Sequence, residues 1–304
     1  MTYRELYNKV TEILIDAGCG SPEFDAGCLL SHFTGVTKGM LPVKGGEPAP
    51  DGISEAAIDA ARQRAGGRPL QYIIGNWDFL SLTLEVGEGV LIPRPDTELL
   101  CEAAAKYLTD FIPSAYEGEK PRVLDLCAGS GCVSLGIASL VPGIRVVAVE
   151  LSEQAFGYLR RNCLRYPRFD VTPVMADVLA DYDKFESGCA AILSNPPYIP
   201  SEQIPCLMRE VLHEPRMALD AGDGLMFYRA ILKHWAPKLV KGGICAVEVG
   251  QGQAPTVAKM FKSAGLGGVE VLKDLNGIER VVLGKARQPI SPYSKSGIFR
   301  ARKI

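Results

Sequence analysis

Residues 123–131 read Val-Leu-Asp-Leu-Cys-Ala-Gly-Ser-Gly, and this stretch decides the fold class. The apolar run before Cys127 predicts a buried strand, and the glycines predict a tight turn. The apolar residues from about Cys132 to Leu140 predict a helix. A strand, a glycine turn and a helix in this order are typical of an open α/β sheet, in which ligands bind at the carboxyl ends of the strands. We therefore expect a ligand site at this turn.

Further apolar runs along the chain predict buried strands, and amphipathic segments separate them. Two strands close this pattern and are joined by a turn at Asn276-Gly277, a dipeptide that favours hairpins. The alternation predicts an α/β fold, with a doubly wound seven-stranded sheet that ends in an antiparallel hairpin. The predicted strands are residues 123–126, 146–150, 171–175, 190–193, 244–249, 269–272 and 280–283.

The residues before the sheet have a different character. Apolar residues at helical spacing over 1–70 predict a small helical N-terminal domain. Its expected role is substrate recognition, and the alternative is a stabilising accessory. Residues 71–97 predict a β-hairpin, with 72–79 facing 82–86, followed by a rigid link at Pro93-Arg94-Pro95. Asp96 or Thr97 is expected to cap a helix that starts near Glu98. The α/β domain is expected over 98–286, and the basic tail 287–304 is predicted to be mobile.

Composition describes an ordinary globular protein of 304 residues, with 47% hydrophobic and 22% charged residues. The net charge of −2 provides no global basic field, so no direct contact with nucleic acid is expected. The nine cysteines are scattered without a Cys-x-x-Cys pair, which predicts free thiols and no metal site. No signal peptide or membrane span is expected, and we predict a soluble, cytoplasmic monomer.

A carboxylate at the end of the second strand suits a nucleoside cofactor. Glu150 stands where an acid can accept hydrogen bonds from both hydroxyls of a ribose. This suits NAD as well as S-adenosylmethionine, but Ser134 occupies the position of the third glycine of the dinucleotide motif. Asp125 fits a ligand with a cationic amine and a sulfonium better than a diphosphate. Together with Asp177 and Asn195 after later strands, the turn predicts an S-adenosylmethionine site.

The fourth strand ends in Ser194-Asn195-Pro196-Pro197-Tyr198. Two prolines cannot continue a sheet ladder, so the strand must stop at Asn195. The side-chain amide of Asn195 and the carbonyl groups of Asn195 and Pro196 are then free to accept hydrogen bonds from a planar group bearing –NH2, with Tyr198 packed on its face. The alternative for this stretch is a proline-rich turn with a capping asparagine.

At this point the sequence resembles the release-factor glutamine methyltransferases. The glycine turn combined with Asn-Pro-Pro-Tyr is the mark of class I methyltransferases that modify amino groups. Further motifs resemble this family in particular, over about residues 1–286. These motifs are Arg68-Pro-Leu-Gln-Tyr-Ile-Ile-Gly75, Leu91-Ile-Pro-Arg-Pro-Asp-Thr-Glu98, Glu214-Pro-Arg-Met-Ala-Leu219 and Asp274-Leu-Asn-Gly-Ile-Glu-Arg280.

The resemblance implies an enzyme that methylates N5 of the glutamine in the Gly-Gly-Gln motif of class 1 peptide chain release factors. S-adenosylmethionine would be the methyl donor and S-adenosylhomocysteine the product. Cys127, Glu150 and Val178 depart from the family pattern of glycine, aspartate and a larger residue. The implied cofactor-binding residues are Asp125, Cys127, Ala128, Gly129, Ser130, Gly131, Glu150, Asp177, Val178 and Asn195. Asn195, Pro196, Pro197 and Tyr198 would bind the substrate, with Asn195, Pro196 and Tyr198 in the catalytic role.

The same arrangement of hydrogen-bond acceptors beside Tyr198 fits two other functions. An adenine N6-methyltransferase would hold the exocyclic amine of adenine in this way, but it would need a base-flipping pocket and a basic surface. A non-catalytic protein could use the Asn195 turn to bind a glutamine-bearing loop, although an intact cofactor turn argues against this. Other residues have structural explanations: Phe227 and Trp235 at helical spacing are expected in the core, and His213 at the surface.

Overall fold

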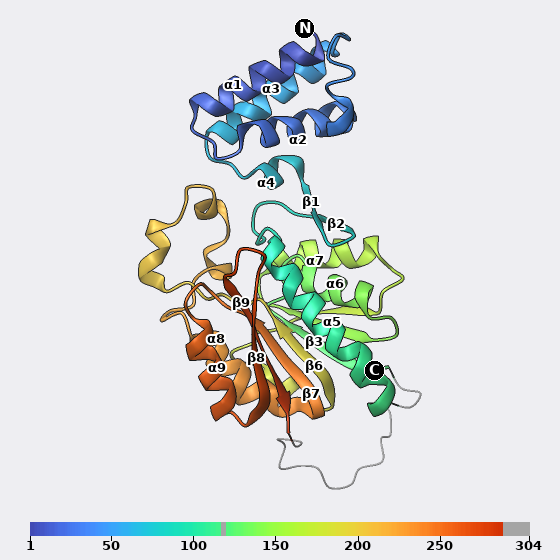
Figure 1. Ribbon diagram of the computed structural model, residues 1–304, viewed down its shortest axis with the longest axis vertical. Coiled ribbons are helices and arrows are strands. Elements are labelled where there is room, and N and C mark those ends of the chain that lie inside the picture. Colours follow the sequence, from blue (N-terminus) through green and yellow to red (C-terminus); the bar gives the residue numbers. More distant parts are fainter. Residues whose placement is uncertain (117–119, 288–304) are drawn as a thin grey trace.

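The N-terminal helices form a small bundle around one apolar core. The computed structural model describes residues 1–116 and 120–287. Leu6, Val10 and Leu14 are completely buried between these helices. Thr2 and Glu5 begin the first helix with a capping box, in which each side chain accepts a hydrogen bond from the other's backbone N–H. The bundle, shown at the top of Figure 1, consists of α1 (Tyr3–Asp16), α2 (Pro22–Thr34) and α3 (Asp51–Ala65).

The expected strand at residues 72–75 is wrong, because this segment forms the short helix α4 (Leu70–Ile74). Gly75 ends the helix in the left-handed conformation, at φ +79°, where glycine is favoured. Leu70, the first residue of α4, belongs to the core of the helical bundle. The predicted domain boundary at residue 70 therefore separates α4 from the bundle into which it packs. A short apolar run does not distinguish a buried strand from a buried helical turn, and here tertiary packing decided.

A two-stranded hairpin follows, as predicted, with β1 (Asn76–Phe79) antiparallel to β2 (Leu82–Glu85). The completely buried Asn162 of α7 (Glu153–Arg165) fastens it to the large domain. Its side-chain oxygen accepts from the Glu85 N–H at 2.7 Å, and its Nδ2 donates to the Glu85 carbonyl at 3.0 Å. The same Nδ2 donates to the Ser130 carbonyl at 2.8 Å. One side chain therefore joins the hairpin, α7 and the glycine turn.

The sequence prediction of a doubly wound, seven-stranded class I methyltransferase sheet is confirmed. The strand order is β5-β4-β3-β6-β7-β9-β8, in which β9 is antiparallel to both of its neighbours and the other pairs are parallel. Helices cover both faces, as Figure 1 shows. The strands are β3 (Arg122–Leu126), β4 (Arg145–Glu150), β5 (Val171–Met175), β6 (Cys189–Ser194), β7 (Leu239–Glu248), β8 (Leu266–Lys273) and β9 (Glu279–Ala286).

Alternate residues of the strands supply two separate cores. Val123 and Val146 face α5 (Pro95–Ala115) and α6 (Cys132–Leu140), together with the hairpin. Leu124 and Leu126 face the opposite side, where α8 (Met226–Ala230), a π-helical turn at Ile231–Trp235 and α9 (Ala254–Ser263) lie. Because both faces are covered, the central strands are continuously apolar. The single helix that was predicted over residues 225–239 is instead a succession of shorter helices of different types.

The link before α5 differs from the expected capping arrangement. The helix begins at Pro95, with Arg94 at the N-cap position and no side-chain capping bond. Proline suits a first helical position because its missing N–H would have no partner there. Thr97 and Asp96 instead bond to Glu248 and Arg280 of other elements. Apart from Arg287, the predicted mobile tail 287–304 lies outside the described residues.

Candidate active site

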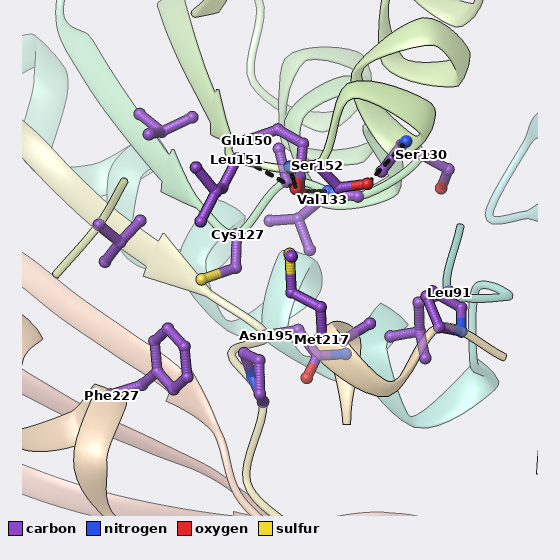
Figure 2. Close-up of a pocket in the computed structure, with 18 of the residues that line it drawn as sticks. Leu91, Cys127, Ser130, Val133, Glu150, Leu151, Ser152, Asn195, Met217 and Phe227 are labelled. Carbon is purple, nitrogen blue, oxygen red and sulfur yellow. Dashed lines mark hydrogen bonds between the residues drawn. The ribbon is translucent and has the colours of Figure 1, made fainter. Parts of the chain in front are cut away.

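A cavity of about 290 Å³ lies at the carboxyl ends of β3, β4 and β6. Figure 2 shows Glu150 on one side of it and Asn195 with Met217 on the other. The loop after β4 and the link at Leu91–Arg94 complete its wall. Of the predicted cofactor-binding residues, those that line it are Cys127, Ala128, Gly129, Ser130, Glu150, Asp177, Val178 and Asn195. The topology thus brings most of the predicted set together at one sheet edge.

The turn between β3 and α6 has the geometry for which its glycines were singled out. Gly129 and Gly131 have φ values of +56° and +85°, which L-residues rarely adopt. At Gly131 an added Cβ would also stand 2.7 Å from Leu159 Cδ1, so this glycine packs closely on α7. Cys127 has a positive φ of +63° despite its side chain, which is uncommon. Gly131 contributes to the shape of the turn but does not line the cavity.

Glu150 holds this turn with its carboxylate. Oε2 accepts from the Gly129 N–H at 2.8 Å, and Oε1 accepts from the N–H groups of Leu151 and Ser152 at 2.8 and 2.7 Å. Burial raises its pKa, while these hydrogen bonds work in the opposite direction. A carboxylate has about four lone-pair positions, so one or more remain for ligand hydroxyls. Glu150 lines the cavity, as its predicted role requires.

Two polar atoms beneath the turn are buried and have no hydrogen-bond partner among the described residues. They are Asp125 Oδ1 and Ser130 Oγ. The other Asp125 oxygen accepts from Ser134 Oγ at 2.5 Å. Burial raises the pKa of Asp125 to about 7. Asp125 does not line the cavity itself. Its predicted effect on a ligand would therefore be transmitted by the residues of the turn.

Asp177 and Val178 follow β5 and close the far end of the cavity. Asp177 Oδ1 accepts from the Leu179 N–H at 2.7 Å, which fixes the loop. The Val178 carbonyl accepts from Trp235 Nε1 at 2.9 Å. Trp235 is completely buried, as predicted. Phe227 was expected in the core as well, but it is half-buried and lines the cavity, because α8 starts beside the sheet edge.

The motif after β6 lies where two cavities meet. A second cavity, of about 200 Å³, is lined by Asn195, Pro196 and Tyr198, whereas Pro197 lines the first. The two cavities share Leu91, Arg94, Asn195 and Ala218. Over the described residues, no hydrogen bond ends on Asn195 Oδ1 or on the Pro196 carbonyl oxygen. Two acceptors therefore stand free at the junction.

The other atoms of this motif are firmly held. Asn195 Nδ2 donates to Thr97 Oγ1 at 3.1 Å, and the Tyr198 hydroxyl donates to Glu248 Oε1 at 3.3 Å. The Tyr198 carbonyl accepts from Gln253 Nε2 at 2.8 Å. Burial raises the pKa of Tyr198, so its hydroxyl stays protonated at neutral pH. The motif is a rigid frame.

Sequence reasoning missed two residues of this frame, Thr97 and Glu248. Thr97 had been one of two candidates, with Asp96, for helix capping. Glu248 is a single acid that ends the apolar strand β7, which is the same signal that identified Glu150 at the end of β4. It could therefore have been found by the same rule. Met217 also lines the cavity from the segment between β6 and α8; it lies in the motif Glu214–Leu219, to which the sequence analysis gave no role at the site.

That segment, residues 199–225, is tied to the rest of the chain by two arginines. Arg94 of the link forms an ion pair with the buried Glu214, whose Oε2 also accepts from the Ile92 N–H at 3.0 Å. Arg64 of α3, which is 6% exposed, forms ion pairs with Asp25 and Glu210 at 2.7 Å each. The wall of the second cavity is thus connected to the helical bundle.

Comparison with known proteins shows the family of this chain. Residues 5–75 match the family model of the PrmC N-terminal domain, and residues 101–236 match that of the methyltransferase small domain. The release factor glutamine methyltransferase of Deinococcus radiodurans is 35% identical over 283 residues, covering 93% of this chain and 98% of the relative. The chain belongs to the release factor glutamine methyltransferase family. The resemblance inferred from its motifs is confirmed.

A second member of this family, from Geobacter sulfurreducens, is 36% identical over 290 residues, which cover 93% of this chain and 96% of that one. Among solved structures, the catalytic domain of hMettl16 in complex with a 3′UTR hairpin aligns at a TM-score of 0.52. It is 14% identical and covers 78% of this chain and 82% of that one, which shows a shared fold alone. In the described part of the chain, no helix is long and apolar enough to span a membrane.

Proposed function

We propose that this protein transfers a methyl group from S-adenosylmethionine to N5 of the glutamine in the Gly-Gly-Gln motif of class 1 peptide chain release factors. The observation that carries the proposal is the pair of free acceptors, Asn195 Oδ1 and the Pro196 carbonyl, at the junction of two cavities. One cavity would take the cofactor and the other the target side chain. Membership of the release factor glutamine methyltransferase family supports this substrate.

The residues around the first cavity fit S-adenosylmethionine. Glu150 would accept hydrogen bonds from the ribose hydroxyls, and Asp177 with Val178 would lie beside the adenine. Ser130 lines this cavity, and its Oγ, which has no partner in the described part of the chain, would bind a polar group at the methionine end, whereas Asp125 does not line the cavity. When bound, S-adenosylmethionine supplies an electrophilic methyl group on its sulfonium.

The motif after β6 would orient a poor nucleophile. The lone pair of an amide nitrogen is delocalised into its carbonyl group. Asn195 Oδ1 and the Pro196 carbonyl would accept the two N–H groups of the glutamine amide, which directs the lone pair and stabilises positive charge that develops on nitrogen. Tyr198 would pack on the plane of the amide and exclude water. No base is needed before transfer, because the proton becomes acidic only afterwards.

The proposal includes where and with what the protein works. Release factors act in translation termination, so we propose a cytoplasmic enzyme that meets its partner as a monomer. The helical bundle and the segment 199–225 would contact the release factor, since the segment lines the second cavity and its Glu210 forms an ion pair with Arg64 of the bundle. Methylation of adenine in nucleic acid is the competing function, because an exocyclic amine would fit the same two acceptors.

The test is methyl transfer from labelled S-adenosylmethionine to a purified release factor, to its Gly-Gly-Gln→Gly-Gly-Ala variant and to DNA. We expect label on the intact release factor alone, and a loss of at least about a hundredfold in kcat with Asn195→Ala. Urea unfolding of the variant, compared with that of the wild type, controls for folding. Label on DNA, or equal label on the Gly-Gly-Ala variant, would contradict the proposal.

A further inference from the structure

Glu248 lies behind the catalytic motif and contacts it through both carboxylate oxygens. It ends β7 and is 2% exposed. Oε2 accepts from Thr97 Oγ1 at 2.6 Å, and Oε1 accepts from the Tyr198 hydroxyl at 3.3 Å. Thr97 is completely buried and in turn accepts from Asn195 Nδ2 at 3.1 Å. One buried carboxylate is thus connected to both functional side chains of the motif.

The protons in this chain can be counted. A threonine hydroxyl has one proton, and that of Thr97 is donated to Glu248. Its oxygen can therefore only accept from Asn195, and the donor must be Nδ2, because Oδ1 carries no proton. The Asn195 amide is planar, so Oδ1 points away from Thr97. The ionised state of Glu248 thereby fixes which end of the Asn195 amide stands free.

We propose that Glu248 is a positioning residue that acts through Thr97 to keep Asn195 Oδ1 turned toward the target amide, and through its contact with Tyr198 to set the opposite wall. The inference rests on the proposed function, in which Asn195 accepts an N–H of the glutamine. A reversed Asn195 amide would present N–H groups to N–H groups and would repel the substrate. Orientation of this one amide therefore decides whether the site accepts or rejects its target.

The inference predicts a pH dependence. Burial raises the pKa of Glu248 to about 7. Glu248 protonated on Oε2 would donate to Thr97 Oγ1, which frees the Thr97 hydroxyl proton for Asn195 and allows the amide to reverse. Activity should therefore rise with pH through the pKa of Glu248. Several titratable or charged groups interact electrostatically with Glu248. They are Asp96 and Cys101 of α5, Cys132 of α6, Tyr198, Tyr228 of α8 and Arg280 of β9.

Two nearly isosteric variants and one control variant test this inference. Glu248→Gln places an N–H donor in the chain, and Thr97→Val removes the hydroxyl while keeping the shape. For both we expect kcat/KM for release-factor methylation to fall by about tenfold or more, with cofactor affinity within about twofold of wild type. Thr97→Ser retains the hydroxyl and should recover most of the activity lost in Thr97→Val.

The pH profile separates positioning from structural support. Wild-type kcat should rise through about pH 7, whereas Glu248→Gln should lack this limb. Equal activity of Thr97→Val and Thr97→Ser, or a pH limb that persists in Glu248→Gln, would overturn the inference. If Glu248→Gln does not fold, the comparison of Thr97→Val with Thr97→Ser decides. Failure of the wild type to methylate any release factor would instead refute the proposed function.

Discussion

Replacing Asp125 with asparagine should make the stability of this protein less dependent on pH. Asp125 is completely buried beneath the glycine turn, and burial raises its pKa from 3.8 to about 7. Its Oδ2 accepts one hydrogen bond, from Ser134, and its Oδ1 has no partner in the described part of the chain. Asp125→Asn has nearly the same shape but never ionises. The variant therefore removes the charge and leaves the packing in place.

The sign and the size of this pH dependence follow from the difference between the pKa of Asp125 in the folded and in the unfolded protein. Between the unfolded and folded pKa values, the unfolded chain has released its proton while the native protein keeps it, so the free energy of unfolding falls as pH rises. Each pH unit in this window costs about 1.4 kcal/mol. From about pH 5 to the folded pKa of about 7, the wild type should lose about 3 kcal/mol through this group. Above that pKa the loss is complete.

The measurement is urea unfolding of the wild type and of Asp125→Asn, without cofactor, at about pH 5 and about pH 8. The difference in free energy of unfolding between variant and wild type should shift toward the variant by about 3 kcal/mol. Asp110→Asn, on the exposed side of α5, is the matched control and should show no such shift. If Asp125→Asn and the wild type change in parallel with pH, the carboxyl of Asp125 ionises normally and the argument fails.

Two further substitutions test the packing that holds the site. Gly131→Ala should lower the free energy of unfolding by about 2–4 kcal/mol, because it adds a contact at 2.7 Å to a strained φ of +85°. Gly143→Ala has a similar φ of +84° with nothing within 4 Å, so it should cost only about 1 kcal/mol, and equal losses in urea unfolding would exclude the clash. Arg64→Ala should cost about 3–5 kcal/mol, because it leaves buried Asp25 without its partner. The exposed Arg62→Ala is its control in thermal unfolding, and a loss below about 1 kcal/mol in Arg64→Ala would show that the ion pair contributes little.

Local sequence was sufficient for the elements that form the centre of the sheet. Residues 123–140 contain strand, turn and helix signals in one continuous stretch, and the β3–α6 unit appears where they predicted it. The two prolines after Asn195 end β6 because neither can donate to a sheet ladder. The hairpin that closes the sheet also has its signal in the chain, at Asn276-Gly277. Each of these features depends on residues that are neighbours in the sequence.

Other features depend on residues that are far apart in the sequence, and there the prediction failed or was silent. The run at 72–75 became a helix because Leu70 and its neighbours pack into the helical bundle. Thr97 left its expected capping role because folding brings Glu248, 151 positions later, within hydrogen-bond distance. The residue types at the site were therefore determined by the sequence alone. Which atoms of Asn195 are held and which stand free was decided only by tertiary structure, because hydrogen-bond direction depends on partners that the chain order does not bring together.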